Sequence, residues 1–167
     1  YALLGACWLN IKTERAIQER ARGIARVAGL LTVAGIVAVS AATPFLETAY
    51  FERWLAWPGI LEVAIVPVLV AVLTLWLARA LTSGRGPDWL PMILSLALFG
   101  LCFVGLGLSM WPHVIPPAIT LQQAAAPASS QLFMLVGAVV LIPIILGYTA
   151  YAYWVFRGKL DPDEGYH

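Results

Sequence analysis

Four long runs of apolar residues alternate with short polar segments along the chain. The runs cover residues 24–43, 58–81, 89–111 and 131–156. At about 1.5 Å per residue, a helix over each run can cross a hydrocarbon core about 30 Å thick. Because the connecting segments are short, sequential helices should be neighbours. The pattern therefore predicts an all-α membrane protein, with four transmembrane helices in an antiparallel bundle.

A shorter apolar run, residues 1–11, precedes the four long ones. It is too short to span a membrane and too lightly charged for a signal peptide. Since the first residue is Tyr1 and not Met, we interpret this run as the end of a truncated fifth helix. We expect residues 1–167 to form a single transmembrane helical domain, the C-terminal half of a longer protein.

The composition agrees with a membrane location. Hydrophobic residues make up 61% of the chain and charged residues 11%, whereas about 25% of a soluble domain is charged. No Asp, Glu, Lys or Arg occurs between Trp89 and Phe156. The net charge of +1 lacks the basic excess that nucleic-acid binding requires, so nucleic acid is not an expected partner.

The basic residues indicate an orientation. Nine of the ten Lys and Arg residues lie in three segments on one side of the predicted bundle, residues 12–26, 79–88 and 157–167. The segments on the other side, 47–62 and 111–131, hold only Arg53. Cytoplasmic loops carry an excess of Lys and Arg, so the C-terminus should be cytoplasmic. We expect residues 12–26 to form a salt-bridged surface loop with a short helical turn, and binding of anionic lipid is the alternative.

Two features of the predicted helices allow a structural or a functional interpretation. Glu62 lies about one turn inside its helix, where a carboxylate can occupy the interface or favour the helix start; a functional polar contact is the alternative. Gly100, Gly105 and Gly107 leave part of another helix almost without side chains. Tight helix packing explains them, and a groove for a lipid tail or a quinone is the alternative.

The chain offers little for catalysis. Haem ligation requires an axial His, Met, Cys or Tyr at membrane depth. His113 lies at a helix boundary, His167 is the last residue, and the three methionines lack a second ligand at helical spacing. Cys7 and Cys102 are best interpreted as small apolar residues. We find no metal cluster, nucleophile–base pair or phosphate loop, and predict no catalytic, cofactor-binding or metal-binding residue.

Two segments carry a resemblance to a known family. Residues 5–22 read GACWLNIKTERAIQERAR, and the stretch 116–159 contains AAAPASSQLFMLVG and ILGYTAYAYWVFRGK. In this order they resemble subunit II of the cytochrome bd-type quinol oxidases, over essentially the whole chain. The family's last helix follows a loop, here bracketed by prolines. We expect Ser129 or Ser130 to cap that helix, and Thr120–Ser130 to be ordered.

The resemblance implies a non-catalytic subunit II in a respiratory quinol oxidase that reduces O2 to water, in the bacterial cytoplasmic (inner) membrane. In that family haem b, haem d and the quinol-oxidising loop belong to subunit I, so this chain should bind no cofactor. The implied partners are subunit I, contacted through helix 131–156, membrane lipid, and a small accessory subunit in some complexes. Half of a secondary transporter is the alternative, because Pro67 and Pro143 could mark broken helices.

Overall fold

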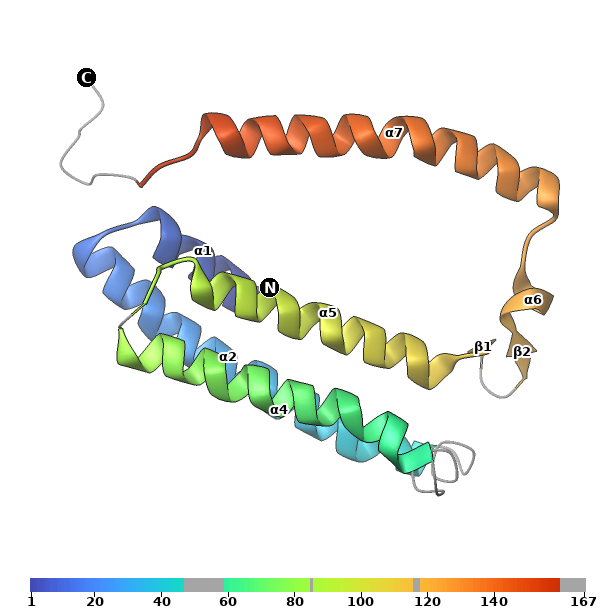
Figure 1. The fold of residues 1–167 in the computed structure, drawn as a ribbon, viewed down its shortest axis with the longest axis horizontal. Helices are drawn as coiled ribbons and strands as arrows, with labels where there is room; N and C mark the ends of the chain where they lie inside the picture. The colour runs from blue at the N-terminus through green and yellow to red at the C-terminus, as the bar shows by residue number, and fades with distance from the viewer. Residues whose placement is uncertain (47–58, 85, 116–117, 160–167) are drawn as a thin grey trace. The chain divides into compact units, whose positions relative to one another are not determined.

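The chain is almost entirely helical where its structure is described. A computed structural model describes residues 1–46, 59–84, 86–115 and 118–159. Its elements in chain order are α1 (Ala2–Lys12), α2 (Arg15–Leu46), α4 (Gly59–Ser83), α5 (Leu90–Met110), β1 (His113–Ile115), β2 (Ile119–Thr120), α6 (Leu121–Ala124) and α7 (Ala128–Val155) (Figure 1). The prediction of an all-α protein is confirmed.

Four of these helices are long and apolar enough to cross a membrane. The qualifying parts are Arg15–Thr43, Ala64–Ser83, Leu90–Met110 and Ala128–Val155. They coincide with the four predicted spans to within a few residues at most ends. Both α4 and α7 continue through their internal prolines, Pro67 and Pro143.

The chain forms two compact units, which we describe separately. The first comprises Tyr1–Ser109 with Lys159–His167, and the second comprises Met110–Gly158. In the first unit α4 runs antiparallel to both α2 and α5 (Figure 1). The short helix α1 packs against α2, and α2 packs against α4.

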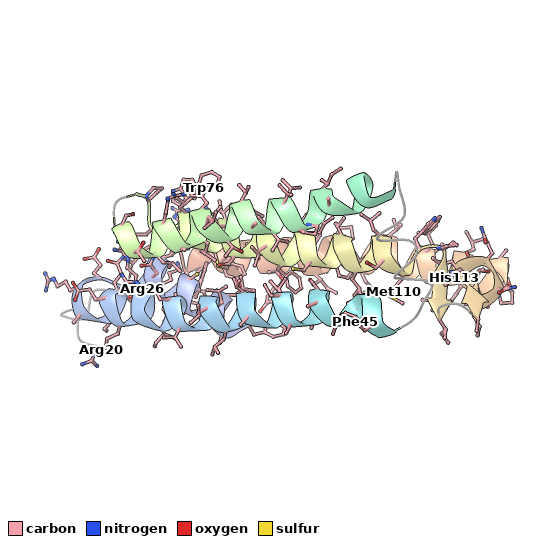
Figure 2. The ribbon with its side chains drawn as sticks, turned by 90° about the horizontal axis from the view of Figure 1, so that it is seen from below. Arg20, Arg26, Phe45, Trp76, Met110 and His113 are labelled. Atoms are coloured by element: carbon pink, nitrogen blue, oxygen red, sulfur yellow. The ribbon has the colours of Figure 1, made fainter. Side chains whose placement is uncertain are left out.

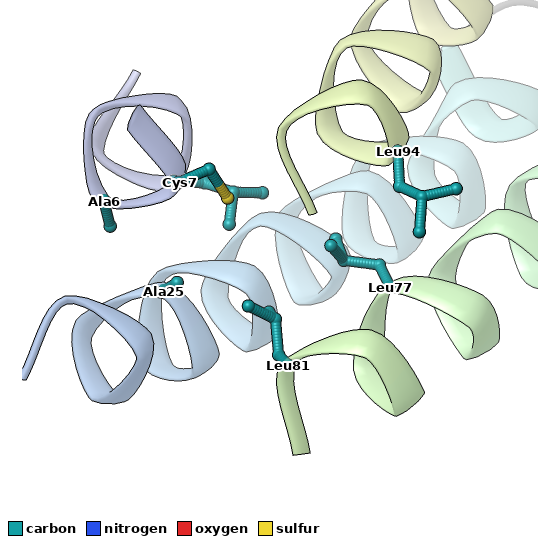
Figure 3. Packing of buried hydrophobic residues seen from close by; sticks show 7 residues of the cluster. Ala6, Cys7, Ala25, Leu77, Leu81 and Leu94 are labelled. Atoms are coloured by element: carbon teal, nitrogen blue, oxygen red, sulfur yellow. The ribbon is translucent and has the colours of Figure 1, made fainter. Parts of the chain in front are cut away.

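Small and aliphatic side chains form the core of the first unit. The buried members are Leu3, Ala6, Cys7, Ala25, Leu77, Leu81 and Leu94, contributed by α1, α2, α4 and α5 (Figure 3). Ala25 is fully buried, which lets α1 approach α2 closely. A Cβ atom on Gly105 would lie 3.1 Å from Val66 Cγ1, so α5 lies against α4 at this glycine. Tight packing therefore explains Gly105, whereas Gly100 and Gly107 have no such neighbour within 4 Å in the described structure.

The basic segment that we expected to be a surface loop is helical. Helix α2 begins at Arg15 and includes Arg20, Arg22 and Arg26. Ala, Arg, Gln and Glu dominate this segment and are strong helix formers. They extend the transmembrane helix by more than two turns on the polar side. The prediction of a loop at residues 12–26 was therefore wrong for most of its length.

The second unit opens with a small strand pair. Strands β1 and β2 are antiparallel, and His113 lies opposite Thr120. The Thr120 hydroxyl accepts a hydrogen bond from the Gln123 backbone N–H at 3.3 Å, and the Gln123 side chain accepts one from the Thr120 N–H at 3.0 Å. This reciprocal capping box starts α6. The strand pair was not predicted.

The last helix begins without the predicted serine cap. Pro127 is the N-cap residue of α7, and no side chain caps the helix there. The Pro127 carbonyl accepts the backbone N–H groups of Ser130 and Gln131 at 2.9 and 3.1 Å. Ser129 and Ser130 are thus the second and third residues of the helix, too late to cap it, and the predicted capping role is wrong. Proline fixes its own backbone near the geometry of a helix start, which explains the earlier boundary.

Candidate functional site

Polar side chains from distant parts of the chain meet at one end of the first unit. Asn10, in the last turn of α1, is fully buried. Its Nδ2 donates to the Asp88 carbonyl oxygen at 2.9 Å, and its Oδ1 accepts from Arg22 Nε at 2.7 Å. The Asn10 carbonyl oxygen accepts from Gln18 Nε2 at 2.9 Å. Asn10 therefore joins α1, the start of α2 and the segment before α5.

Asp88 connects this buried amide to two positive charges. Its Oδ1 lies 2.9 Å from Arg22 Nη2, and its Oδ2 lies 2.7 Å from Lys159 Nζ. Lys159 follows α7 in the chain and also lies 3.8 Å from a Glu14 carboxylate oxygen. We call Asn10, Gln18, Arg22, Asp88 and Lys159 the polar cluster. Its members come from four separate segments, so it holds those segments in register.

The electrostatics of the polar cluster favour the charged forms of its members. Partial burial alone raises the pKa of the Asp88 carboxyl. Hydrogen bonds from Lys159 and Gln18 lower it, as do the positive charges of Lys159 and Arg22, and the resulting pKa is below its ordinary value. The hydrogen bond to Asp88 raises the pKa of the Lys159 ammonium, and the Asp88 and Glu14 charges act in the same direction. Both groups are therefore charged near neutral pH.

Neighbouring contacts extend this arrangement to the end of α4. Arg26 Nε donates to the Leu81 carbonyl oxygen at 2.9 Å, so a positive side chain lies at a helix C-terminus, where the helix dipole favours it. Gly84 has φ +59°, and a Cβ atom there would lie 3.3 Å from Arg22 Nη1. The turn after α4 therefore needs glycine both for its left-handed backbone and for its approach to the guanidinium group.

Further into the helices of the described structure, one polar contact joins α1 to α5. Cys7 Sγ lies 3.5 Å from Ser95 Oγ, and Ser95 Oγ donates to the Pro91 carbonyl oxygen at 2.8 Å. Cys7 is buried in the core and Cys102 is partly buried, and both are free thiols. These contacts suit helix packing, since Ser and Cys are small and can satisfy their polar atoms within or between helices.

The described residues contain no reactive constellation. No group of three or more His, Cys, Asp or Glu side chains could hold a metal ion within that part of the chain. His113 is half-buried in β1. Glu62 belongs to the first turn of α4, but its side chain lies outside the description. The one carboxylate of the polar cluster, Asp88, is paired with two cations. This pairing suits a role in holding helices together, because a general base needs a carboxylate that can take up a proton.

The sequence interpretation missed the polar cluster. It placed Asn10 in the apolar run at residues 1–11 and Asp88 in the polar segment 79–88, and gave neither a role. One signal was available: an Asn near the end of an apolar helix needs hydrogen-bond partners if it is buried. Its partner Asp88 lies 78 positions away in the chain, and no local pattern specifies that pairing.

Comparison with known proteins agrees with this picture of an integral membrane protein of multi-pass helical type. The profile of the family "Cytochrome bd terminal oxidase subunit II" matches residues 1–156, so the chain belongs to that family. It is 26% identical to "Cytochrome bd-I ubiquinol oxidase subunit 2" of Escherichia coli strain K12, over 96% of this chain and 49% of the relative. It is also 26% identical to "Probable cytochrome oxidase subunit 2" of Haemophilus influenzae, over 94% of this chain and 48% of the relative. The chain thus spans about half the length of both relatives.

Proposed function

We propose that this chain is part of a non-catalytic subunit II, its C-terminal half, in a cytochrome bd-type quinol oxidase. The whole complex oxidises quinol and reduces O2 to water in the bacterial cytoplasmic membrane. The family match over residues 1–156 is the observation that carries this proposal. The uninterrupted helices at Pro67 and Pro143 also favour it over a secondary transporter, whose binding site usually lies at broken helices.

We place haem b, haem d and the quinol site in the partner, subunit I, as the resemblance to the cytochrome bd family implies. In the described part of this chain the one histidine, His113, lies in the strand pair and outside the four long helices. Cys7 contacts Ser95 in the helix core. The role left to this chain is to bury an apolar side of the haem-carrying subunit and to limit the access of water to it.

Helix α7 is the surface that we assign to subunit I. It carries no charged residue and is mostly apolar, and none of its residues is buried within the described structure. Gly137 and Gly147 have open space where a Cβ atom would lie, and the Tyr148 and Tyr151 rings are exposed. Lipid tails adapt to any surface, whereas helix association in lipid depends on small residues and hydrogen-bonding side chains. Packing of the same glycines inside subunit II is the competing explanation.

The function is tested with the complex purified through its full-length subunit II. We expect the haem-carrying subunit to co-purify, together with the visible absorption bands of haem b and haem d. A colourless preparation without that subunit would rule out the proposed function.

The α7 contact is tested separately with Gly147→Leu, using Ile144→Leu as the control because it changes shape without adding bulk. We expect Gly147→Leu to insert into the membrane but to lose subunit I and the haem bands, while Ile144→Leu keeps both. If Gly147→Leu retains the partner and its spectrum, α7 belongs to the internal packing of subunit II.

A further inference from the structure

One arginine at the polar end of the first unit is not engaged by the protein. Arg20 is exposed and has no ion pair or side-chain hydrogen bond within the described part of the chain. By contrast, Arg22 is bound to Asp88 and Arg26 to the Leu81 carbonyl oxygen. Figure 2 shows Arg20 projecting away from α4, while Arg26 lies on the side of α2 that faces α4. Arg20 is therefore available to a ligand from outside the unit.

A shallow apolar depression lies on the face of α2 below this arginine. It is lined by Gly23, Ile24, Val27, Ala28 and Leu31. Ile24, Val27 and Leu31 are 56–67% exposed, so no other described part of the first unit covers the depression. Glycine and alanine lower the helix profile between the three larger side chains, which leaves room for a narrow apolar ligand.

Helical geometry places the charge and the depression in one line. Arg20, Ile24, Val27 and Leu31 follow the spacing i, i+4, i+7, i+11, which puts them on a single helix face. Arg20 lies about 6 Å along the axis from Ile24, towards the polar end of the helix. Glu19 points about 100° away from Arg20 around the helix, and Arg22 is occupied by Asp88. The face therefore combines one positive charge at the membrane boundary with an apolar track below it.

We propose that this face binds an anionic phospholipid. Its phosphate group pairs with Arg20, and one acyl chain lies along the depression. The charge complementarity selects this occupant, because an apolar helix of another protein segment leaves Arg20 without a counter-ion at the membrane boundary. Anionic lipids attract basic residues that lie at their surface. The lipid belongs to the cytoplasmic leaflet if the proposed orientation is correct.

The test uses the complex that contains full-length subunit II, reconstituted in lipid nanodiscs. Small amounts of phosphatidylglycerol or phosphatidylcholine, each with a photoreactive acyl chain, are added and cross-linked by light. Mass spectrometry then measures labelling of residues 23–31. The variants are Arg20→Gln, Arg20→Lys and, as matched control, Arg79→Gln, because Arg79 is another exposed arginine at this end of the unit.

We expect phosphatidylglycerol to label residues 23–31 in preference to phosphatidylcholine, and unlabelled phosphatidylglycerol to compete. Arg20→Gln should reduce the labelling roughly fivefold, the effect of one basic residue at a lipid surface. Arg20→Lys should retain most of it, and Arg79→Gln all of it. Equal labelling by the two lipids would overturn the proposal in favour of unselective lipid contact. Absence of labelling with either lipid would overturn it in favour of a protein segment covering the face.

Discussion

At the scale of single residues, Asn10 is a fully buried polar side chain whose amide needs hydrogen-bond partners. Its amide group serves both the Asp88 carbonyl oxygen and Arg22 Nε. A buried polar atom that loses its partner costs more than the net gain of one hydrogen bond. Asn10 therefore stabilises the fold mainly by keeping two other groups satisfied.

We predict that Asn10→Leu, which conserves volume, lowers the free energy of unfolding by about 2 kcal/mol, because it leaves both partners unsatisfied. Thermal unfolding of full-length subunit II in detergent measures the effect. Gln18→Ala is the control, since its hydrogen bonds to the Asn10 carbonyl oxygen and to Asp88 are only partly buried and their loss should cost about 1 kcal/mol. Equal stability of Asn10→Leu and wild type would show that the buried amide contributes nothing.

The pair of Asp88 and Lys159 predicts a defined pH dependence. The folded-state pKa of Asp88 lies below the ordinary 3.8, so its stabilisation is complete above that value and is lost as the pH falls through the lowered pKa. The pKa of Lys159 lies above the ordinary 10.5, so its stabilisation is complete below 10.5 and is lost as the pH rises through the raised pKa.

Wild type should therefore exceed Asp88→Asn in stability by a constant amount between about pH 5 and pH 9, and this difference should shrink in acid below about pH 4. We expect the plateau to be about 1 kcal/mol at most, because the Asp88 side chain is 27% exposed and partly exposed ion pairs contribute little. Unfolding of both proteins across this range measures it. A difference that changes between pH 6 and pH 8 would contradict the assignment.

At the scale of elements, hydrophobic runs located the long helices well but not their polar ends. The run at residues 24–43 marks the apolar part of α2, whereas the helix itself is Arg15–Leu46. The basic segment before the apolar run is not hydrophobic, but its residues have high helix propensity, so the helix begins there. The start of α7 was misplaced for a related reason. Two serines resembled a cap, but α7 begins before them at Ala128, with Pro127 as its N-cap residue.

The short element α6 gives the clearest test of a cap in this chain. Thr120 forms a complete capping box with Gln123, so Thr120→Ala should destabilise the loop locally by about 1 kcal/mol. Limited proteolysis of residues 118–130 measures this as faster cleavage. Ser129→Ala combined with Ser130→Ala is the matched control and should leave cleavage unchanged, because neither serine caps a helix here. Faster cleavage of the double serine variant, with unchanged cleavage of Thr120→Ala, would show that the serines and not Thr120 stabilise this loop.

At the scale of the whole molecule, the sequence was sufficient to predict four apolar helices and the family. Length and hydropathy determine which segments can span a bilayer, and residues 5–22 together with the stretch 116–159 carry the family resemblance. The polar cluster was not predictable in the same way. It depends on Asp88 meeting Arg22 and Lys159, which are 66 and 71 positions away. Such pairings follow from the tertiary fold and do not produce a periodic pattern in the sequence.

The distribution of Lys and Arg residues predicts the orientation of the four helices in the membrane. Nine of the ten Lys and Arg residues lie in segments that should share one side of the membrane, and moving such groups through the bilayer is costly. Three spans, α2, α4 and α5, separate Glu19 from Gln122, so these two exposed positions should lie on opposite sides.

We therefore replace Glu19 or Gln122 with Cys in a background where Cys7 and Cys102 are Ala, in the full-length complex. A membrane-impermeant maleimide should label Gln122→Cys in intact cells, because the charge pattern predicts that this loop lies outside. It should label Glu19→Cys only in inverted vesicles, because the same pattern predicts a cytoplasmic start of α2. Disrupted membranes serve as the control that both thiols can react. The reverse pattern would invert the topology, and labelling of both positions from the same side would contradict the three intervening spans.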